Sequence, residues 1–312
     1  MLTVYYGEEL ASYGFGEGHP FGPDRLDAFW NEARNQGLDT KVTIAEPVSA
    51  GRQDLELFHE HSYIEKLINL SRFGSGYLDS GDTPAFPGIY EAACIVSGCV
   101  LDGLSRIMSD QSTRAFIPIA GLHHARREGA AGFCAVNDIG ILIETLRKHY
   151  GIQRIAYVDI DAHHGDGVFY AYENDPDLIF ADIHEDGRQL YPGTGFEDET
   201  GKGDAAGTKL NIPMTPPHCR DEDFMQVWER VEDFVRAGQP EFIILQAGAD
   251  SLAGDPITNM QYTSAAHAHA ARRLCVLADE LCDGRMLATG GGGYNRNNLA
   301  AAWTAVVREM ID

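Results

Sequence analysis

The chain is poor in basic residues. Its 312 residues include 24 Lys and Arg against 47 Asp and Glu, which gives a formal net charge of −23. Direct binding to nucleic acid needs a basic footprint that neutralises phosphates, so this balance argues against it. An acidic protein is compatible with cationic substrates or partners, although acidity alone identifies neither.

Cysteine motifs and long apolar runs are also missing. The six cysteines, at positions 94, 99, 134, 219, 275 and 282, form no C-x-x-C pair and no regular framework, which favours reduced thiols in a cytoplasmic protein. The N-terminal MLTVYYGEELASYG lacks the basic and apolar regions of a secretory signal. No apolar run approaches the length of a membrane span, so we expect no membrane association.

Apolar segments that predict strands alternate with helical patterns along the whole chain. Strands are expected at 2–6, 41–44, 115–120, 154–158, 178–183, 209–213, 242–245 and 286–288. The longer helices are expected to end at Arg34 and Tyr150, to span 55–73, 89–108, 221–237 and 265–281, and to close the chain. With no linker or internal repeat, this alternation predicts one α/β domain over residues 1–312, a doubly wound, mostly parallel sheet with helices on both faces.

The stretch YVDIDAHHGDGV at 157–168 carries the strongest chemical signal. It begins in an apolar strand that we expect to be buried on both faces. Asp159, Asp161 and His163 follow at a spacing of two, which in extended chain directs them to the same side. Carboxylates with an imidazole suit zinc or ferrous iron better than calcium or magnesium. Solvated loop charges are the alternative, but unpaired they would be costly directly after a buried strand.

Further polar clusters accompany other predicted strands, at 121–124, 182–184, 250–255 and 290–294. The carboxyl ends of parallel strands meet at one edge of the sheet, where open α/β sheets bind their ligands. Since a catalytic zinc site commonly has three protein ligands, Asp250 is the expected third. A turn or helix-capping role is the alternative for Asp250.

His123 and His124 form an adjacent pair after a predicted buried strand, which indicates an acid/base pair. Each ring needs an acceptor that fixes its tautomer, and Asp159 and Asp166 are available, one for each. A lone histidine here would more often be a satisfied core residue. Asp166 alone would serve as the N-cap of the helix that HGDGV opens.

The segment GGGGYN at 290–295 lacks the Lys-Ser/Thr ending of a Walker motif and the G-x-G-x-x-G spacing. Four glycines after a strand instead let the backbone pass close to a substrate while presenting Tyr294. Its hydroxyl is placed to donate to an oxyanion that develops beside a metal ion.

The motifs GLHHARREGAAGFC, VDIDAHHGDG, LYPGTG, AGADSLAGDP and GGGGYN, in this order, resemble the zinc-dependent histone deacetylase superfamily. That family includes bacterial acetoin-utilisation deacetylases and acetylpolyamine amidohydrolases. The resemblance extends from about Gly18 to the C-terminus. It implies the arginase-deacetylase fold with an eight-stranded parallel sheet, and a hydrolase that removes acyl groups from amines.

The resemblance also implies the roles of individual residues. Zn²⁺ would be bound by Asp161, His163 and Asp250. His124 would be the principal general base and acid, assisted by His123, with Asp159 and Asp166 as their partners and Tyr294 as the transition-state tyrosine. Substrate contacts are expected from Asp82, Gly132, Phe133, Tyr191 and Ile257, and Arg25 is expected in an internal channel for acetate release. Phe133 and Tyr191 would form the aromatic walls of an acyl-lysine tunnel, although many relatives have Phe where this chain has Tyr191.

Potassium is a second cofactor that the resemblance implies. An inner K⁺ site would involve Asp159, Asp161, His163, Asp182 and Ile183. An outer site would use main-chain carbonyls near Tyr172, Asp175, Leu178 and Thr208. Asp182 stands where a serine is common, which changes the charge around the inner ion.

We therefore expect a metal-dependent amide hydrolase that acts on acylated lysine in a protein or peptide. An acetylpolyamine amidohydrolase is the nearest alternative, but the gatekeeper position carries apolar Ile257 and the loop from Tyr13 to Arg25 is short. The more distant alternatives are a dimanganese ureohydrolase and a non-catalytic acyl-lysine reader. The tandem histidines and GGGGYN argue against the first, and the complete set of expected catalytic residues argues against the second.

Overall fold

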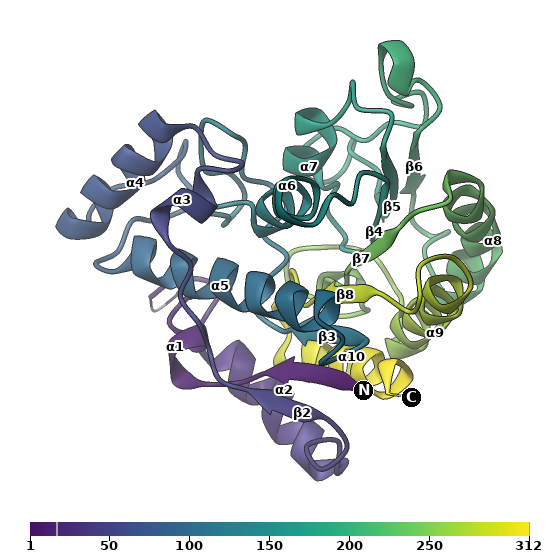
Figure 1. Ribbon diagram of the computed structural model, residues 1–312, viewed down its shortest axis with the longest axis horizontal. Coiled ribbons are helices and arrows are strands. Elements are labelled where there is room, and N and C mark those ends of the chain that lie inside the picture. The colour runs from purple at the N-terminus through teal and green to yellow at the C-terminus, as the bar shows by residue number, and fades with distance from the viewer. Residues whose placement is uncertain (17, 312) are drawn as a thin grey trace.

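The computed structural model describes residues 1–16 and 18–311, and its centre is one eight-stranded sheet (Figure 1). The strands are β1 (Leu2–Tyr5), β2 (Thr43–Ala45), β3 (Arg114–Ile117), β4 (Ile155–Asp159), β5 (Leu178–Glu185), β6 (Lys209–Met214), β7 (Phe242–Gln246) and β8 (Met286–Thr289). They lie in the order β2-β1-β3-β8-β7-β4-β5-β6, and all neighbouring pairs are parallel. The predicted α/β fold with an eight-stranded parallel sheet is thus confirmed.

Helices flank the sheet along its length (Figure 1). They are α1 (Glu8–Ala11), α2 (Asp24–Asn35), α3 (Arg52–Leu55), α4 (His61–Phe73), α5 (Ile89–Met108), α6 (Asp138–Tyr150), α7 (Asp166–Ala171), α8 (Asp221–Gly238), α9 (Ser264–Leu281) and α10 (Arg296–Met310). Short 3₁₀ turns lie at Gly203–Ala205 and Ala249–Ser251. Within residues 1–16 and 18–311, no helix is both long and apolar enough to cross a lipid bilayer.

Packing around β3 demonstrates that helices cover both faces. A β-carbon at Gly103 of α5 would lie 3.2 Å from Ala115 and 3.5 Å from Ile117, so α5 rests on the face that these two residues share. Trp303 of α10 packs against Phe116, with ring centroids 6.4 Å apart. Successive strand residues point to opposite faces, so α5 and α10 lie on opposite sides of the sheet. Every residue of β3, β4, β7 and β8 is buried, as a two-sided parallel sheet requires.

The helix expected at 55–73 is confirmed only over α4, His61–Phe73, because α3 already ends at Leu55 and the residues between them are not helical. In the interruption, the buried ring of His59 accepts a hydrogen bond at Nε2 from the backbone amide of Asn137, at 2.9 Å. The interruption thus contains a contact to a segment 78 residues further along the chain. A tertiary contact therefore overrides the local helical pattern.

Two strands end differently from the prediction. The strand expected at 115–120 stops at Ile117, because Pro118 has no N–H with which to continue the ladder. Strand β5 continues to Glu185, which pairs with Met214, so Asp182 and His184 lie inside the strand and not beyond its end.

The strands that lead into the predicted polar clusters are neighbours. In the order β3-β8-β7-β4, their carboxyl ends lead to residues 121–124, 290–294, 250–255 and 159–166. Four segments that are far apart in the sequence therefore reach one edge of the sheet, as the strand-end argument predicted.

Candidate functional site

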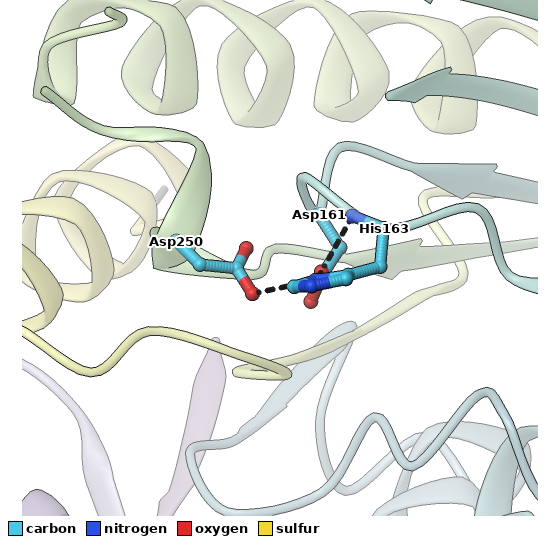
Figure 2. A group of neighbouring side chains, drawn as sticks. All are labelled: Asp161, His163 and Asp250. Atoms are coloured by element: carbon cyan, nitrogen blue, oxygen red, sulfur yellow. Dashed lines mark hydrogen bonds and ion pairs between the residues drawn. The ribbon is translucent and has the colours of Figure 1, made fainter. Parts of the chain in front are cut away.

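Asp161, His163 and Asp250 form a buried group of potential metal ligands (Figure 2). His163 Nδ1 lies 3.0 Å from Asp161 Oδ1 and 3.1 Å from Asp250 Oδ2, and one ligand atom of each residue lies within 4.8 Å of the others. Ligands of one tetrahedral ion at ordinary bond lengths are separated by roughly 3.3 Å. The three atoms therefore have the spacing of ligands to a single ion.

The remaining carboxylate oxygens of this group are held by the protein. Asp161 Oδ2 accepts hydrogen bonds from Gln246 Nε2 at 2.8 Å and from the amide of Gly292 at 2.9 Å. Asp250 Oδ1 accepts from the amide of Ala162 at 2.9 Å, so Asp250 is not a helix cap. Each aspartate thus keeps one oxygen directed at His163 while hydrogen bonds to the other oxygen fix its orientation, as is common for metal ligands.

Electrostatics also favour a cation between these groups. Burial and the charge of Asp161 raise the pKa of Asp250 to about 7. Although burial opposes it, hydrogen bonding to Asp161 and Asp250 raises the pKa of His163 to about 10. The two buried carboxylates share one imidazole proton, and a divalent ion bound between these groups would displace that proton. The set of two carboxylates and one imidazole fits such an ion.

Asp159 does not belong to this group. Strand β4 ends at Asp159, and beyond it a turn forms in which Asp161 Oδ1 accepts from the amide of His163 at 3.0 Å. The expectation that all three residues face one point in extended chain is therefore wrong in its geometry. The turn joins Asp161 to His163, and the Asp159 carboxylate is directed at His123 instead.

His123 and His124 each have a carboxylate partner. His123 Nδ1 lies 2.7 Å from Asp159 Oδ2, and His124 Nδ1 lies 2.7 Å from Asp166 Oδ1. The Nε2 atoms of the two rings are 3.1 Å apart. Asp166 is the first residue of α7 and Gly165 is its N-cap, so the capping alternative does not hold for Asp166.

The two rings differ in charge. Burial and the neighbouring charge of His123 lower the pKa of His124 to about 4. Burial opposes protonation of His123, but Asp159 and Asp161 outweigh it and raise its pKa to about 10. These opposite shifts favour a neutral His124 beside a protonated His123.

Two residues that were not predicted from the sequence hold the loop that carries His123 and His124. The Asp138 carboxylate accepts from the amides of Gly121 at 2.8 Å and Leu122 at 2.9 Å. Asn137 caps α6 and donates from Nδ2 to the carbonyl oxygen of His123 at 3.3 Å. The dipeptide Asn137-Asp138 directly before a helical pattern was a capping signal that could have identified both.

Asp161 and His163 of the metal-ligand group and both histidines of the pair line one cavity of about 300 Å³. Its lining includes Phe21, Asp82, Leu122, His123, His124, Gly132, Phe133, Cys134, Asp161, His163, Leu190, Tyr191, Ile257, Gly292 and Tyr294. Five substrate contacts predicted from the sequence thus line the same cavity, while Phe21, Cys134 and Leu190 were not predicted. Leu190 is adjacent to Tyr191 in the LYPGTG motif, which was the available signal.

Phe133 and Tyr191 form aromatic walls of this cavity. Phe133 has a left-handed backbone with φ of 68°, which is strained for a side chain of this size. The strain is held by hydrogen bonds at both peptide groups, from the Phe133 amide to Thr83 Oγ1 at 3.0 Å and from Tyr13 Oη to the Phe133 carbonyl at 2.8 Å. The Tyr191 ring packs edge-on against His124, with centroids 5.1 Å apart.

Tyr294 also lines the cavity and packs against Phe133, with ring centroids 5.8 Å apart. Its amide donates to Asp255 Oδ2 at 2.8 Å, and Asp255 Oδ1 accepts from the amide of Ile257 at 3.1 Å. Burial and the charges of Asp250 and Asp161 raise the pKa of the Tyr294 phenol well above 10. The hydroxyl therefore stays protonated and available as a donor.

Arg25 lies buried behind the glycine segment. Its Nε donates to the carbonyl of Gly293 at 2.9 Å and its Nη2 to that of Gly291 at 2.5 Å. The guanidinium carbon stands 4.0 Å from the ring centroid of Phe21, which lines the cavity. Nη1 is buried without a hydrogen-bond partner among the described residues, so its two N–H donors remain available to an anion.

Asp82 lies at the exposed end of the cavity beside Asp79. Oδ1 of Asp79 accepts from the amides of Gly81, Asp82 and Thr83 at 3.0–3.1 Å, which fixes the loop. Burial and the neighbouring Asp79 carboxylate raise the pKa of Asp82 to about 6.

The residues expected around potassium lie on and beside β4, β5 and β6. Asp159 pairs in register with Asp182, whose carboxylate accepts from His184 Nδ1 at 2.7 Å and from the amide of Gly165 at 2.9 Å. The expected outer set consists of Tyr172, Asp175, Leu178 and Thr208. Three of these four residues give an oxygen to the ammonium of Lys209, and the Tyr172 carbonyl accepts from the amide of Asp175.

Comparison with known proteins agrees with this geometry. The family model of the histone deacetylase domain matches residues 19–310. The acetoin utilization protein AcuC of Bacillus subtilis is 34% identical over 98% of this chain and 81% of its own length. The histone deacetylase clr6 of Schizosaccharomyces pombe is 32% identical over 97% of this chain and 75% of its own length.

Among solved structures, the crystal structure of the HDA15 HD domain superposes with a TM-score of 0.91 at 27% identity. The superposition covers 99% of this chain and 88% of that one. The superposition therefore includes the sheet whose carboxyl edge carries the metal-ligand group. The chain therefore belongs to the histone deacetylase superfamily and is a hydrolase of the deacetylase class.

Proposed function

We propose that the protein is a zinc-dependent amidohydrolase that removes acetyl or other short acyl groups from lysine side chains of proteins or peptides. The observation that carries this proposal is that Asp161 and His163 of the metal-ligand group and both histidines of the His–Asp pairs line one cavity that also has aromatic walls. Such a cavity accepts a linear aliphatic chain and brings its terminal amide to the acid/base groups.

In this proposal Asp161, His163 and Asp250 hold Zn²⁺, with Fe²⁺ as the alternative ion of similar preference. When bound, the ion supplies Lewis acidity to the acyl carbonyl and makes water a better nucleophile at neutral pH. His163 would hold the ion through Nδ1, the nitrogen that lies near both aspartates, and this nitrogen would have to be deprotonated.

His124 is the proposed general base and acid. Its Nδ1 donates to Asp166, which leaves Nε2 to take the proton of the attacking water and to return it to the leaving amine. His123, held by Asp159 and next to His124, would assist by stabilising negative charge that develops beside the pair. Such general acid–base groups typically contribute about 10²–10⁴-fold to a rate.

Tyr294 is the proposed oxyanion donor. Its protonated hydroxyl stabilises an oxygen that gains charge only as the carbonyl becomes tetrahedral, so the interaction strengthens in the transition state. Asp255 supports this role, because it fixes the backbone from which Tyr294 projects.

We assign the walls of the substrate tunnel to Gly132, Phe133, Tyr191 and Ile257, and the substrate backbone contact to Asp82. Arg25, with its unpartnered Nη1 behind the cavity, suits transient binding of the acetate product. An inner K⁺ held by Asp159, Asp161, His163, Asp182 and Ile183 would lie where β4 and β5 pair. All six cysteines are buried and none forms a disulfide bond, which supports a reducing, cytoplasmic location.

The alternatives predict different chemistry. The tunnel mouth has the 37% exposed Ile257 where a polyamine-selective enzyme would benefit from a carboxylate. A dimetal ureohydrolase needs a second set of ligands, whereas the described residues contain one group of at least three close His, Cys, Asp or Glu donors. A non-catalytic acyl-lysine reader would have no need for two His–Asp pairs beside the potential metal ligands.

The test is hydrolysis of a panel of acetyl-lysine peptides, longer acyl-lysine peptides, acetylpolyamines and arginine by purified protein. We expect lysine deacylation that a chelator abolishes and that added Zn²⁺ restores. Hydrolysis of arginine would instead support the ureohydrolase. Tight binding of acetyl-lysine peptide without any product would support the reader.

A further inference from the structure

Lys209, the first residue of β6, is a buried lysine with no role in the proposed reaction. The residue is 2% exposed. Its Nζ donates to the carbonyl oxygens of Asp175 and Leu178 and to Thr208 Oγ1, each at 2.8 Å. An ammonium has three N–H donors, so all of them are used. The three oxygens thus form a cation-binding site, and the cation that occupies it is the ammonium of Lys209 itself.

The oxygens around this ammonium come from the residues expected to hold a second potassium ion. The remaining two carbonyls of that set already have partners. The Tyr172 carbonyl accepts from the amide of Asp175 at 3.0 Å, and the Thr208 carbonyl accepts from the amide of Phe180 at 3.1 Å. A potassium ion would have to share the carbonyls of Asp175 and Leu178 with a second positive charge, which Coulomb repulsion opposes. The residues present do not fit the ion.

We propose that the Lys209 ammonium takes the place of the outer potassium ion in this protein, so that the site needs no alkali-metal ion. Lys209 then ties together three parts of the chain that are separate in the sequence. These are the segment between α7 and β5, which contains Asp175, the start of β5 at Leu178, and the start of β6. Arg147 of α6 pairs with the Asp175 carboxylate and secures the same segment from the other side.

This placement links the lysine to the candidate active site through α7. That helix begins at Asp166, the partner of His124, and ends directly before the segment that Lys209 holds. Removing the ammonium without replacing it should therefore loosen the segment, and a potassium ion should be able to compensate once the lysine is gone.

The first experiment measures the melting temperature of wild-type protein and of Lys209→Ala in KCl and in choline chloride at equal ionic strength. We expect the variant to melt lower than wild type in choline chloride and to show a larger rise in Tm with K⁺. Lys202→Ala is the matched control, because Lys202 pairs at 2.9 Å with Glu173 in the same region but is exposed. Its response to K⁺ should equal that of wild type.

The second experiment locates the ion directly and does not depend on how well the variant folds. Crystals grown with Tl⁺ in place of K⁺ should give no anomalous peak beside the carbonyls of Asp175 and Leu178 in wild-type protein. In Lys209→Ala a peak should appear at that position. A peak there in wild type, or a variant whose Tm responds to K⁺ no more than wild type does, would overturn the proposal. Neither readout requires deacylase activity, so failure of the proposed function would leave both results interpretable.

Discussion

Gly132 lies so close to His124 that a β-carbon at residue 132 would stand 2.4 Å from His124 Cδ2. The backbone at Gly132 is also left-handed, with φ of 54°, which disfavours any side chain. The glycine is therefore what allows the loop that leads to Phe133 to close over the histidine ring.

Gly132→Ala should displace His124 and reduce kcat by about 10²-fold, since small misplacements of a catalytic group have effects of this size. KM should change less, because the tunnel walls remain. Gly129→Ala is the control, as a β-carbon there meets no atom within 4 Å. Steady-state kinetics of both variants decide the matter, and equal kcat values would show that the ring tolerates the contact.

Asp250→Ala should remove most of the bound metal and the activity with it, because the variant retains only two of three proposed ligands. Metal content per chain after dialysis is the measurement. Asp204→Ala removes an exposed carboxylate from the turn at Gly203–Ala205 and should keep the wild-type content. Full retention of metal by Asp250→Ala would exclude Asp250 from the ligand set.

Ile257 should direct the enzyme towards acyl-lysine and away from polyamines. It presents no carboxylate to attract a second ammonium at the tunnel mouth, so kcat/KM for acetyl-lysine peptides should exceed that for acetylspermidine or acetylputrescine. Ile257→Glu should shift this ratio towards the polyamines, with Ile257→Gln as the uncharged control. The reverse preference in wild-type protein would assign the enzyme to the polyamine class.

Asp82 should make kcat/KM for peptide substrates depend on pH near pH 6. Its pKa is raised to about 6 by burial and by Asp79, so it is neutral below that pH and an anionic acceptor above it. If it accepts hydrogen bonds from the substrate backbone, kcat/KM for peptides should rise as the pH passes through this value. The rise should be absent in Asp82→Asn, and a profile unchanged by the substitution would contradict the contact.

The same shift has an opposite consequence for stability. The folded pKa of about 6 exceeds the ordinary value of 3.8, so the folded state binds the proton more tightly. The stability that Asp82 contributes is therefore fully present below pH 3.8 and is lost as the pH rises through 6. Thermal melting on both sides of this window should show Asp82→Asn gaining stability relative to wild type only on the alkaline side.

Tyr294→Phe should lower kcat by on the order of 10²–10³-fold with a much smaller change in KM, because only a transition-state donor is removed. The metal content should not change, since Tyr294 is not a proposed ligand. If kcat is retained and only KM rises, Tyr294 contributes to binding and not to stabilisation of the oxyanion.

The sequence alone was sufficient for the fold class and for most of the candidate site. Local patterns carried this information, because buried parallel strands are recognisable as short apolar runs and each polar cluster directly follows or lies within such a run. His123, Asp161, Asp250 and Tyr294 could be assigned to one edge of the sheet for this reason. The resemblance of five ordered motifs added the family, and the comparisons confirm it.

Tertiary structure decided which strands are neighbours and what each polar group contacts. The order β3-β8-β7-β4 places four distant segments together, and no local pattern encodes that order. Only the folded chain shows that Asp159 turns to His123, that Gln246 holds Asp161, and that Lys209 reaches the carbonyls of Asp175 and Leu178. These contacts join residues far apart in the sequence, so they depend on how helices and strands pack around the sheet and not on the residues beside them in the chain.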